Sequence, residues 1–283
     1  MCEICGCEGD GAVVRQVGQS AHHGRDGRDE HVHVHPDGRI FTHRHEHPHP
    51  PETHEVATVR EPVQVQVLAR NRALAARNRS LLQQRRVFAV NLMSSPGAGK
   101  TTLLSRTLPE LHRTGPVSVI EGDQATALDA NRLAQTGLPV VQVNTGTGCH
   151  LDADMIAAAL QQLAPAPSTL LIIENVGNLV CPALFDLGEG KRVVLLSVTE
   201  GDDKPEKYPH MFAAADLVVL TKLDLLAHVD FDVSRARRAV SQLNPKAEWL
   251  EVSAKTGEGI PALLAWFDAL RVSHAVDLAD AAR

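Results

Sequence analysis

The chain has 283 residues, of which 43% are hydrophobic and 22% are charged, and its formal net charge at pH 7 is −6. A net negative chain without a basic stripe is not expected to bind nucleic acid, because it cannot release counterions from phosphates. The chain also lacks a run of about eighteen apolar residues and the basic, then apolar, start of a signal peptide, so we expect a cytoplasmic protein without membrane contact.

Residues 1–61 have almost no apolar periodicity, which predicts a disordered tail or one ordered only by metal. The chain starts with three thiols, Cys2, Cys5 and Cys7, and Gly6 lets the backbone fold around one ion. The odd number of cysteines favours metal ligation over disulfides. The cluster lacks the second C-x-x-C of a zinc ribbon, so the α-amino group or a backbone amide is the expected fourth donor, as Ni²⁺ accepts. A redox pair is the alternative.

The tail also contains ten of the fifteen histidines of the chain. They are His22, His23, His31, His33, His35, His43, His45, His47, His49 and His54. Neutral imidazole is a ligand for both Zn²⁺ and Ni²⁺, so the tract offers many overlapping weak sites. Storage or buffering of metal is the favoured role, and a solvated linker with incidental metal affinity is the alternative.

Residues 62–86 predict an amphipathic helix, because apolar residues recur there at heptad spacing. These residues are Val67, Leu74 and Leu81, with Leu68 and Leu82 beside them. The helix can pack on the domain that follows or against a partner, and we favour packing on its own domain.

Residues 87–272 predict a domain in which apolar runs alternate with helical patterns. The runs are rich in Val, Ile and Leu without polar alternation, which is typical of a parallel sheet covered on both faces. The predicted strands are 88–93, 117–121, 140–144, 170–174, 193–198, 217–221 and 249–253. The predicted helices are 100–112, 126–135, 152–163, 233–243 and 260–272. This rhythm indicates a doubly wound α/β fold with right-handed crossovers and a ligand site at the carboxyl ends of the strands. Residues 273–283 are expected to be a frayed end.

A glycine-rich loop joins the first predicted strand of the domain to the helix after it. In a phosphate loop, backbone N–H groups surround the phosphates, the Lys reaches the β- and γ-phosphates, and the next hydroxyl binds Mg²⁺. The residues expected to contact nucleotide here are Ser95, Gly97, Ala98, Gly99, Lys100, Thr101 and Thr102. Lys100 takes the catalytic role and Thr101 binds Mg²⁺, whereas Ser94 replaces the first Gly of the strict motif. A turn that binds nothing is the alternative, and the strand–loop–helix context disfavours it.

Guanine specificity is predicted at the end of a later strand, where Thr221, Lys222 and Asp224 lie. The carboxylate can accept both N1–H and N2–H of guanine, and adenine would leave it unpaired. Thr221 departs from the Asn of the common motif. Three residues after the last strand support the base from the other side: Ser253, Ala254 and Lys255.

Two acids at strand ends, Asp123 and Glu174, are the candidates for Mg²⁺ binding and for handling the attacking water. Asp123 is the expected second Mg²⁺ ligand, and the N–H of Gly177 can report the γ-phosphate. No residue corresponds clearly to a water-orienting Gln or an arginine finger, so intrinsic turnover is expected to be slow, about 10⁻⁴ to 10⁻² s⁻¹.

A second metal site is predicted within the domain, at Cys149, His150 and Cys181. Thiolate and imidazole suit Ni²⁺ or Zn²⁺, and three ligands from one chain leave room for water or a second subunit. The alternative is that the thiols are small buried apolar groups. Because Cys181 follows Gly177 closely, we hypothesise that GTP and Mg²⁺ reposition residues 174–181 and so link metal affinity to nucleotide state.

Taken together, these motifs resemble the hydrogenase nickel-incorporation GTPases of the HypB family. The resemblance rests on the N-terminal Cys cluster, the His tract, the phosphate loop, and the segments around residues 121–123, 148–152, 174–182 and 201–205. It implies a P-loop GTPase of the SIMIBI-type metallochaperone class that binds GTP or GDP and delivers nickel during hydrogenase maturation.

The resemblance also implies roles for particular residues and partners. Cys2, Cys5 and Cys7 would form the high-affinity nickel site, and the Cys149 site would lie at the interface of a nucleotide-dependent homodimer. Lys204 would contact nucleotide across that dimer. The implied partners are other hydrogenase accessory proteins and the precursor of the hydrogenase large subunit.

Two other functions fit part of the pattern. A urease accessory GTPase shares the fold and can carry a His-rich tail, but it does not account for the N-terminal thiols or the spacing of Cys149 and Cys181. A nickel storage protein with a vestigial GTPase is disfavoured by the intact Lys100, Thr101 and Asp224.

Overall fold

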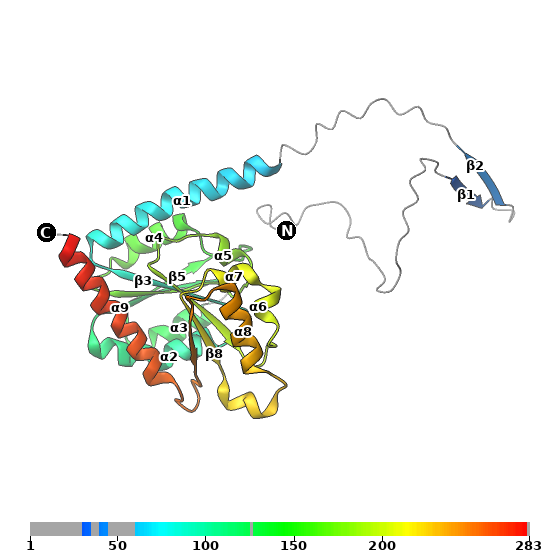
Figure 1. Cartoon of the computed structure of the whole chain (residues 1–283). Coiled ribbons are helices and arrows are strands. Elements are labelled where there is room, and N and C mark those ends of the chain that lie inside the picture. Colours follow the sequence, from blue (N-terminus) through cyan, green and yellow to red (C-terminus); the bar gives the residue numbers. More distant parts are fainter. Residues whose placement is uncertain (1–29, 35–39, 45–59, 125–126, 282–283) are drawn as a thin grey trace. The chain divides into compact units, whose positions relative to one another are not determined.

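The computed structural model describes residues 30–34, 40–44, 60–124 and 127–281, which fall into two separate units (Figure 1). In the N-terminal unit, β1 (Glu30–Val34) pairs antiparallel with β2 (Ile40–Arg44), and His31 lies opposite His43. The prediction of a tail that is disordered or ordered only by metal did not include these two strands, where β-branched residues favour extended backbone. His33 also lies in β1, opposite Phe41. The predicted nickel ligands Cys2, Cys5 and Cys7 and the other seven histidines of the tract lie outside the described residues.

The second unit is built on a seven-stranded sheet in which every pairing is parallel, in the order β5-β4-β6-β3-β7-β8-β9. The strands are β3 (Phe88–Ser94), β4 (Val117–Asp123), β5 (Val140–Asn144), β6 (Leu170–Glu174), β7 (Lys191–Ser197), β8 (Leu217–Thr221) and β9 (Glu248–Glu251). Every predicted strand is present, with ends within two residues of the prediction. The doubly wound α/β prediction is therefore confirmed.

Helices connect these strands. They are α1 (Arg60–Gln84), α2 (Lys100–Thr114), α3 (Leu128–Ala134), α4 (Ala153–Leu163), α5 (Cys181–Leu184), α6 (Lys204–Lys207), α7 (Pro209–Ala213), α8 (Val233–Leu243) and α9 (Ile260–Ala281), with the 3₁₀ helix η1 (Leu223–His228). The short elements α5, α6, α7 and η1 were not predicted. None of the described helices is both long enough and apolar enough to cross a bilayer.

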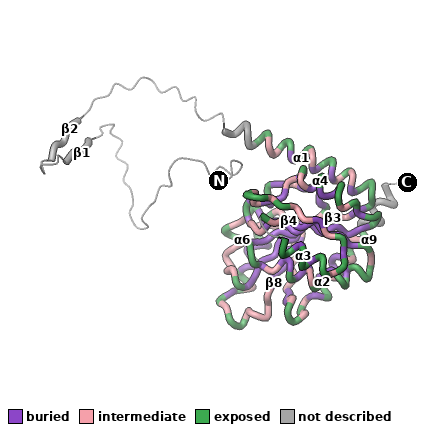
Figure 2. Tube along the Cα trace, turned by 180° about the vertical axis from the view of Figure 1, so that it is seen from behind, coloured by how far each residue is buried: buried purple, intermediate pink, exposed green. Residues whose placement is uncertain are grey.

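The sheet is buried on both faces, as the purple strands in Figure 2 show. Val90 and Leu92 of β3 pack with the helices α2, α3 and α9, whereas Ala89 and Met93 point to the opposite face, which α1, α4, α7 and α8 cover. This alternation along a strand that has no polar side is why the strands appear in the sequence as continuous apolar runs.

Helix α1 packs on the main domain, as favoured from the sequence, but through a face other than the predicted heptad. The buried residues of α1 are Asn71, Ala75, Asn78 and Leu82, whereas Val67, Leu74 and Leu81 are only partly buried. The Nδ2 group of Asn78 donates to the carbonyls of Ala153 at 2.8 Å and Leu187 at 3.1 Å. Amide hydrogen bonds therefore take much of the role that apolar packing was expected to play.

At the C-terminus, α9 continues to Ala281, so the expectation of a frayed end is corrected over residues 273–281. This segment contains neither Gly nor Pro and is rich in Ala, which favours helix. At the opposite end of the helix, Trp266 and Phe267 anchor α9 on the sheet.

Candidate functional site

The phosphate loop lies between β3 and α2 and is built around two glycines in the left-handed region. Gly97 has φ of 76° and Gly99 has φ of 98°, conformations that other residues adopt only with strain. Gly177 is close to this loop, because a Cβ placed on it would lie 2.9 Å from the Cα of Pro96. The segment after β6 thus passes directly against the phosphate loop, as expected for a phosphate sensor.

Lys100, the first residue of α2, is buried, and its Nζ donates to the hydroxyl of Ser94 at 2.8 Å. Burial lowers the pKa of Lys100, while the negative charge of Glu174 opposes that shift. Ser94 is the departure from the strict motif, and its side chain holds the lysine of the loop in place.

The residues predicted to bind Mg²⁺ fit that ion. The hydroxyl of Thr101 donates to Glu174 Oε1 at 2.6 Å, and Glu174 Oε2 is buried with no hydrogen-bond partner among the described residues. Burial raises the pKa of Glu174 to about 7. Asp123, Thr101 and Glu174 all line a cavity of about 500 Å³ beside the phosphate loop, which we call the phosphate cavity. Mg²⁺ prefers hydroxyl and carboxylate oxygens as ligands. A bound cation would also offset the negative charge that Glu174 and Asp123 bring to the cavity.

Several side chains that line this cavity were not selected from the sequence as site residues, among them Glu121 and Arg132. Glu121 is only 2% exposed, and its Oε2 lacks a hydrogen-bond partner within the described part of the chain. Burial, together with the negative charge of Glu174, raises the pKa of Glu121 to about 8. Arg132 of α3 also lines the cavity, and its Nη1 donates to the hydroxyl of Thr102 at 3.2 Å.

Glu121 could have been found from the sequence, because it lies two residues before Asp123 on a predicted strand and so points to the same side of the sheet. Arg132 could not, because only the folded position of α3 brings it to the phosphate loop. Glu200, which follows β7, was also missed: it accepts a hydrogen bond from Ser95 of the loop, and burial raises its pKa.

A second cavity of about 150 Å³ lies where the base was predicted, lined among others by Lys222, Asp224, Ala254 and Lys255. The hydroxyl of Ser253 donates to Asp224 Oδ1 at 2.6 Å and so orients the carboxylate. The predicted guanine-binding residues are therefore brought together by the fold.

Thr221, the departure from the common guanine motif, has a structural role in this arrangement. Its hydroxyl donates to the carbonyl of Ala98 in the phosphate loop at 2.7 Å. This contact ties the base side of the site to the phosphate side. Lys222 follows with φ of 61°, a left-handed turn that directs the chain into η1.

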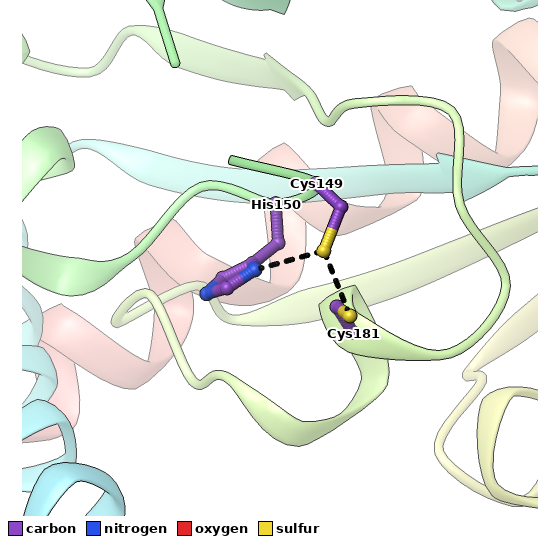
Figure 3. Close-up of side chains that lie close together, drawn as sticks. All are labelled: Cys149, His150 and Cys181. Carbon is purple, nitrogen blue, oxygen red and sulfur yellow. Dashed lines mark hydrogen bonds between the residues drawn. The ribbon is translucent and has the colours of Figure 1, made fainter. Parts of the chain in front are cut away.

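The predicted metal ligands of the domain lie together, as Figure 3 shows. Sγ of Cys149 is 2.9 Å from Sγ of Cys181 and 3.6 Å from Nδ1 of His150, and one ligand atom of each residue lies within 4.8 Å of the others. Burial lowers the pKa of His150, which favours the neutral, ligating imidazole. The His150 ring is 3.9 Å from that of Phe185. This donor set suits a soft divalent ion.

Lys204, at the start of α6, lines neither cavity, and its Nζ lies 5.1 Å from the ring of Tyr208. Its predicted contact with the nucleotide of a second subunit stays a prediction.

Comparison with known proteins agrees with this geometry. The family model described as CobW/HypB/UreG, nucleotide-binding domain, matches residues 88–251. The chain is 53% identical over 214 residues to the hydrogenase maturation factor HypB of Rhizobium leguminosarum bv. viciae, which covers 76% of this chain and 72% of that protein.

Two solved structures are similar as well. HypB from Archaeoglobus fulgidus has a TM-score of 0.68 and 39% identity over 72% of this chain and 99% of its own. HypB from Helicobacter pylori in complex with nickel has a TM-score of 0.68 and 38% identity over 72% of this chain and 96% of its own. The family model covers both HypB and UreG, whereas the similar proteins named here are all HypB. This chain therefore belongs to the CobW/HypB/UreG family of P-loop GTPases, among the HypB hydrogenase maturation factors.

Proposed function

We propose that this protein is a GTP-hydrolysing nickel metallochaperone that binds nickel and inserts it during maturation of nickel–iron hydrogenase. The observation that carries the proposal is the cluster of Cys149, His150 and Cys181, whose donor atoms suit a soft metal ion, on the same domain as the phosphate and base cavities. The similar Helicobacter pylori protein was solved in complex with nickel, which supports the choice of cargo.

In the GTPase step, the loop N–H groups and Lys100 bind the phosphates while Asp224 selects guanine. Thr101, Glu174 and Asp123 would hold Mg²⁺, which supplies positive charge against the phosphates when bound. Lys222 extends over the base site, and its Nζ lies 3.4 Å from the hydroxyl of Thr199. The sequence motifs supply neither a water-orienting Gln nor an arginine finger, so we keep the prediction of slow intrinsic turnover.

The cargo is held by three ligands, which leaves coordination incomplete for one subunit. A nucleotide-dependent homodimer would place a second copy of the site nearby. Val180 and Leu184, which flank Cys181, are 52% and 46% exposed, and such apolar residues beside an incomplete site support a subunit contact there. Lys204 would then reach the nucleotide of the second subunit.

The partners that follow are other hydrogenase accessory proteins and the precursor of the hydrogenase large subunit. The N-terminal thiols Cys2, Cys5 and Cys7 would bind nickel with high affinity, and the His tract would buffer it. We place this activity in the cytoplasm, where Cys149 and Cys181 would stay reduced and able to ligate.

Complementation of a strain that lacks this gene tests the proposal. Cys149→Ala and Lys100→Ala should each abolish hydrogenase activity, with and without added nickel, whereas Arg113→Ala on the exposed end of α2 should restore it fully. In vitro, Cys149→Ala should keep its GTP turnover, and Lys100→Ala should lose about 100-fold or more. Full hydrogenase activity with Lys100→Ala, or rescue of both variants by nickel alone, would instead indicate a storage protein.

A further inference from the structure

The two ends of the Cys149–His150 pair are each held by one side chain from the nucleotide site. Before the pair, the carbonyl of Gly148 accepts a hydrogen bond from Gln124 Nε2 at 3.2 Å. After the pair, the N–H of Leu151 donates to Asn175 Oδ1 at 3.1 Å. The backbone that positions two of the three metal ligands is thus bracketed by these contacts.

Both of these side chains belong to the phosphate cavity, which Gln124 and Asn175 line. Each directly follows one of the two acids expected to bind Mg²⁺: Gln124 follows Asp123, and Asn175 follows Glu174. The N–H of Gln124 also donates to Asp123 Oδ1 at 2.7 Å. We call residues 148–151 the metal-binding loop. If nucleotide and Mg²⁺ displace Asp123 or Glu174, the residue that follows the displaced acid moves with it, and that residue contacts the metal-binding loop.

Asn175 has little freedom to absorb such a displacement. It is 1% exposed, its Oδ1 also accepts from the N–H of Val176 at 2.9 Å, and its Nδ2 donates to Asn91 Oδ1 at 3.2 Å. The metal-binding loop is equally confined, because the side chain of Leu151 would lie 2.8 Å from a Cβ placed on Gly122. In a close-packed interior, a shift at one contact is passed to the next.

Gln124 is the more accessible of the two, at the exposed edge of the same cavity. Removing the Gln124 side chain therefore tests the connection between the nucleotide site and the metal site without creating a cavity in the core. Gln124 and Asn175 directly follow two different strands, β4 and β6, and their contacts lie at opposite ends of the Cys149–His150 dipeptide.

We propose that Gln124 and Asn175 are positioning residues that transmit the nucleotide state of the GTPase site to the Cys149–His150 metal site. This rests on the proposed function, and it identifies the contacts through which GTP and GDP give the site different affinities for a soft divalent ion. By linkage, the bound ion must change nucleotide affinity by the same factor.

The test uses the full chain with Cys2, Cys5 and Cys7 changed to Ser, so that the only thiolate ligands left are Cys149 and Cys181. Ni²⁺ is titrated against a competing chelator while thiolate-to-metal charge-transfer absorption is followed, a signal that the histidines do not produce. The titration is done with saturating GDP and with the β,γ-imido analogue of GTP, each with Mg²⁺. We expect the two affinities to differ by about fivefold or more.

In this background, Gln124→Ala and Asn175→Ala should each bring the affinity ratio towards one. The matched controls are Gln242→Ala on α8 and Asn244→Ala, away from both sites. Asn244→Ala also removes side-chain hydrogen bonds to the backbone, which Nδ2 donates to the carbonyls of Ala213 and Ala215. Both controls should keep the ratio. If Asn175→Ala fails to fold, Gln124→Ala decides.

A ratio that survives in Gln124→Ala and in any folded Asn175→Ala protein overturns the inference, and so does a ratio of one in the background chain. Absence of any thiolate–nickel band would overturn the proposed function itself, so the two failures are distinguishable.

Discussion

At the scale of single residues, the phosphate cavity is lined by many charged side chains. Four carboxylates and three cations line it: Glu121, Asp123, Asp129, Glu174, Lys100, Arg132 and Lys222. Those carboxylates that are ionised would repel a triphosphate, and a divalent cation bound among them would offset that repulsion. The cations must then supply the direct contacts to the phosphates, and Arg132 is one that the motifs did not identify.

We therefore predict that Arg132→Ala weakens GTP binding by about tenfold, because a charge-assisted contact is worth roughly 1.5–3 kcal/mol and this side chain is partly solvated. The turnover rate should fall as well. Titration with a fluorescent GTP analogue and a single-turnover assay measure the two effects. Arg113→Ala, at the exposed end of α2, is the control. Unchanged affinity and turnover in Arg132→Ala would mean that the arginine serves only to hold Thr102.

At the scale of elements, α1 shows how a helix can be fixed by a few polar contacts. Arg79 pairs with Asp186 at 2.8 Å, and Asn71 Nδ2 donates to the carbonyl of the same aspartate, also at 2.8 Å. Burial alone would raise the pKa of Asp186, but the hydrogen bonds from Arg79 and Gly188 lower it overall. These contacts hold the loop before β7 against the helix.

The sharpest test of this docking is Asn78→Ala. The change leaves two buried carbonyls, those of Ala153 and Leu187, without their shared donor, and each unsatisfied group costs about 1–3 kcal/mol. We expect the free energy of unfolding, from urea denaturation, to fall by about 2–4 kcal/mol. Ser80→Ala, an exposed position on the same helix, should change it by less than about 0.5 kcal/mol. If Asn78→Ala lowers the free energy of unfolding no more than Ser80→Ala does, these contacts of α1 contribute little to domain stability.

The same elements show what a sequence can and cannot predict. The strands were predicted accurately because short, continuous runs of Val, Ile and Leu between turns are typical of buried parallel strands. The buried face of α1 was only partly predicted: Leu82 was named, but Asn71 and Asn78 were not, because a search for apolar periodicity does not detect asparagines. The phosphate loop and the Cys149 cluster follow from local motifs, whereas Arg132 and Glu200 enter the site through tertiary packing. No local pattern distinguishes them from solvent-exposed charges.

At the scale of the whole molecule, the metal site raises the question of the second subunit. Cys181 is buried, with its Sγ against that of Cys149, yet the nearby apolar residues Val180 and Leu184 are exposed. An apolar surface of this kind beside an incomplete ligand set fits a contact made only in one nucleotide state. This apolar surface lies at α5, just after Gly177, the predicted sensor of the γ-phosphate, and this proximity would make assembly depend on GTP.

This argument predicts that Leu184→Glu blocks dimer formation, because it places a charge where a second copy of α5 would pack. Light scattering after size exclusion should show the wild-type chain shifting to a dimer with Ni²⁺ and the imido analogue of GTP, and the variant staying a monomer. Val272→Glu is the matched control, since Val272 is 66% exposed on α9, which covers the other face of the sheet. A variant that dimerises like the wild type would place the subunit contact elsewhere, and Cys149, His150 and Cys181 would then have to hold the ion within one chain.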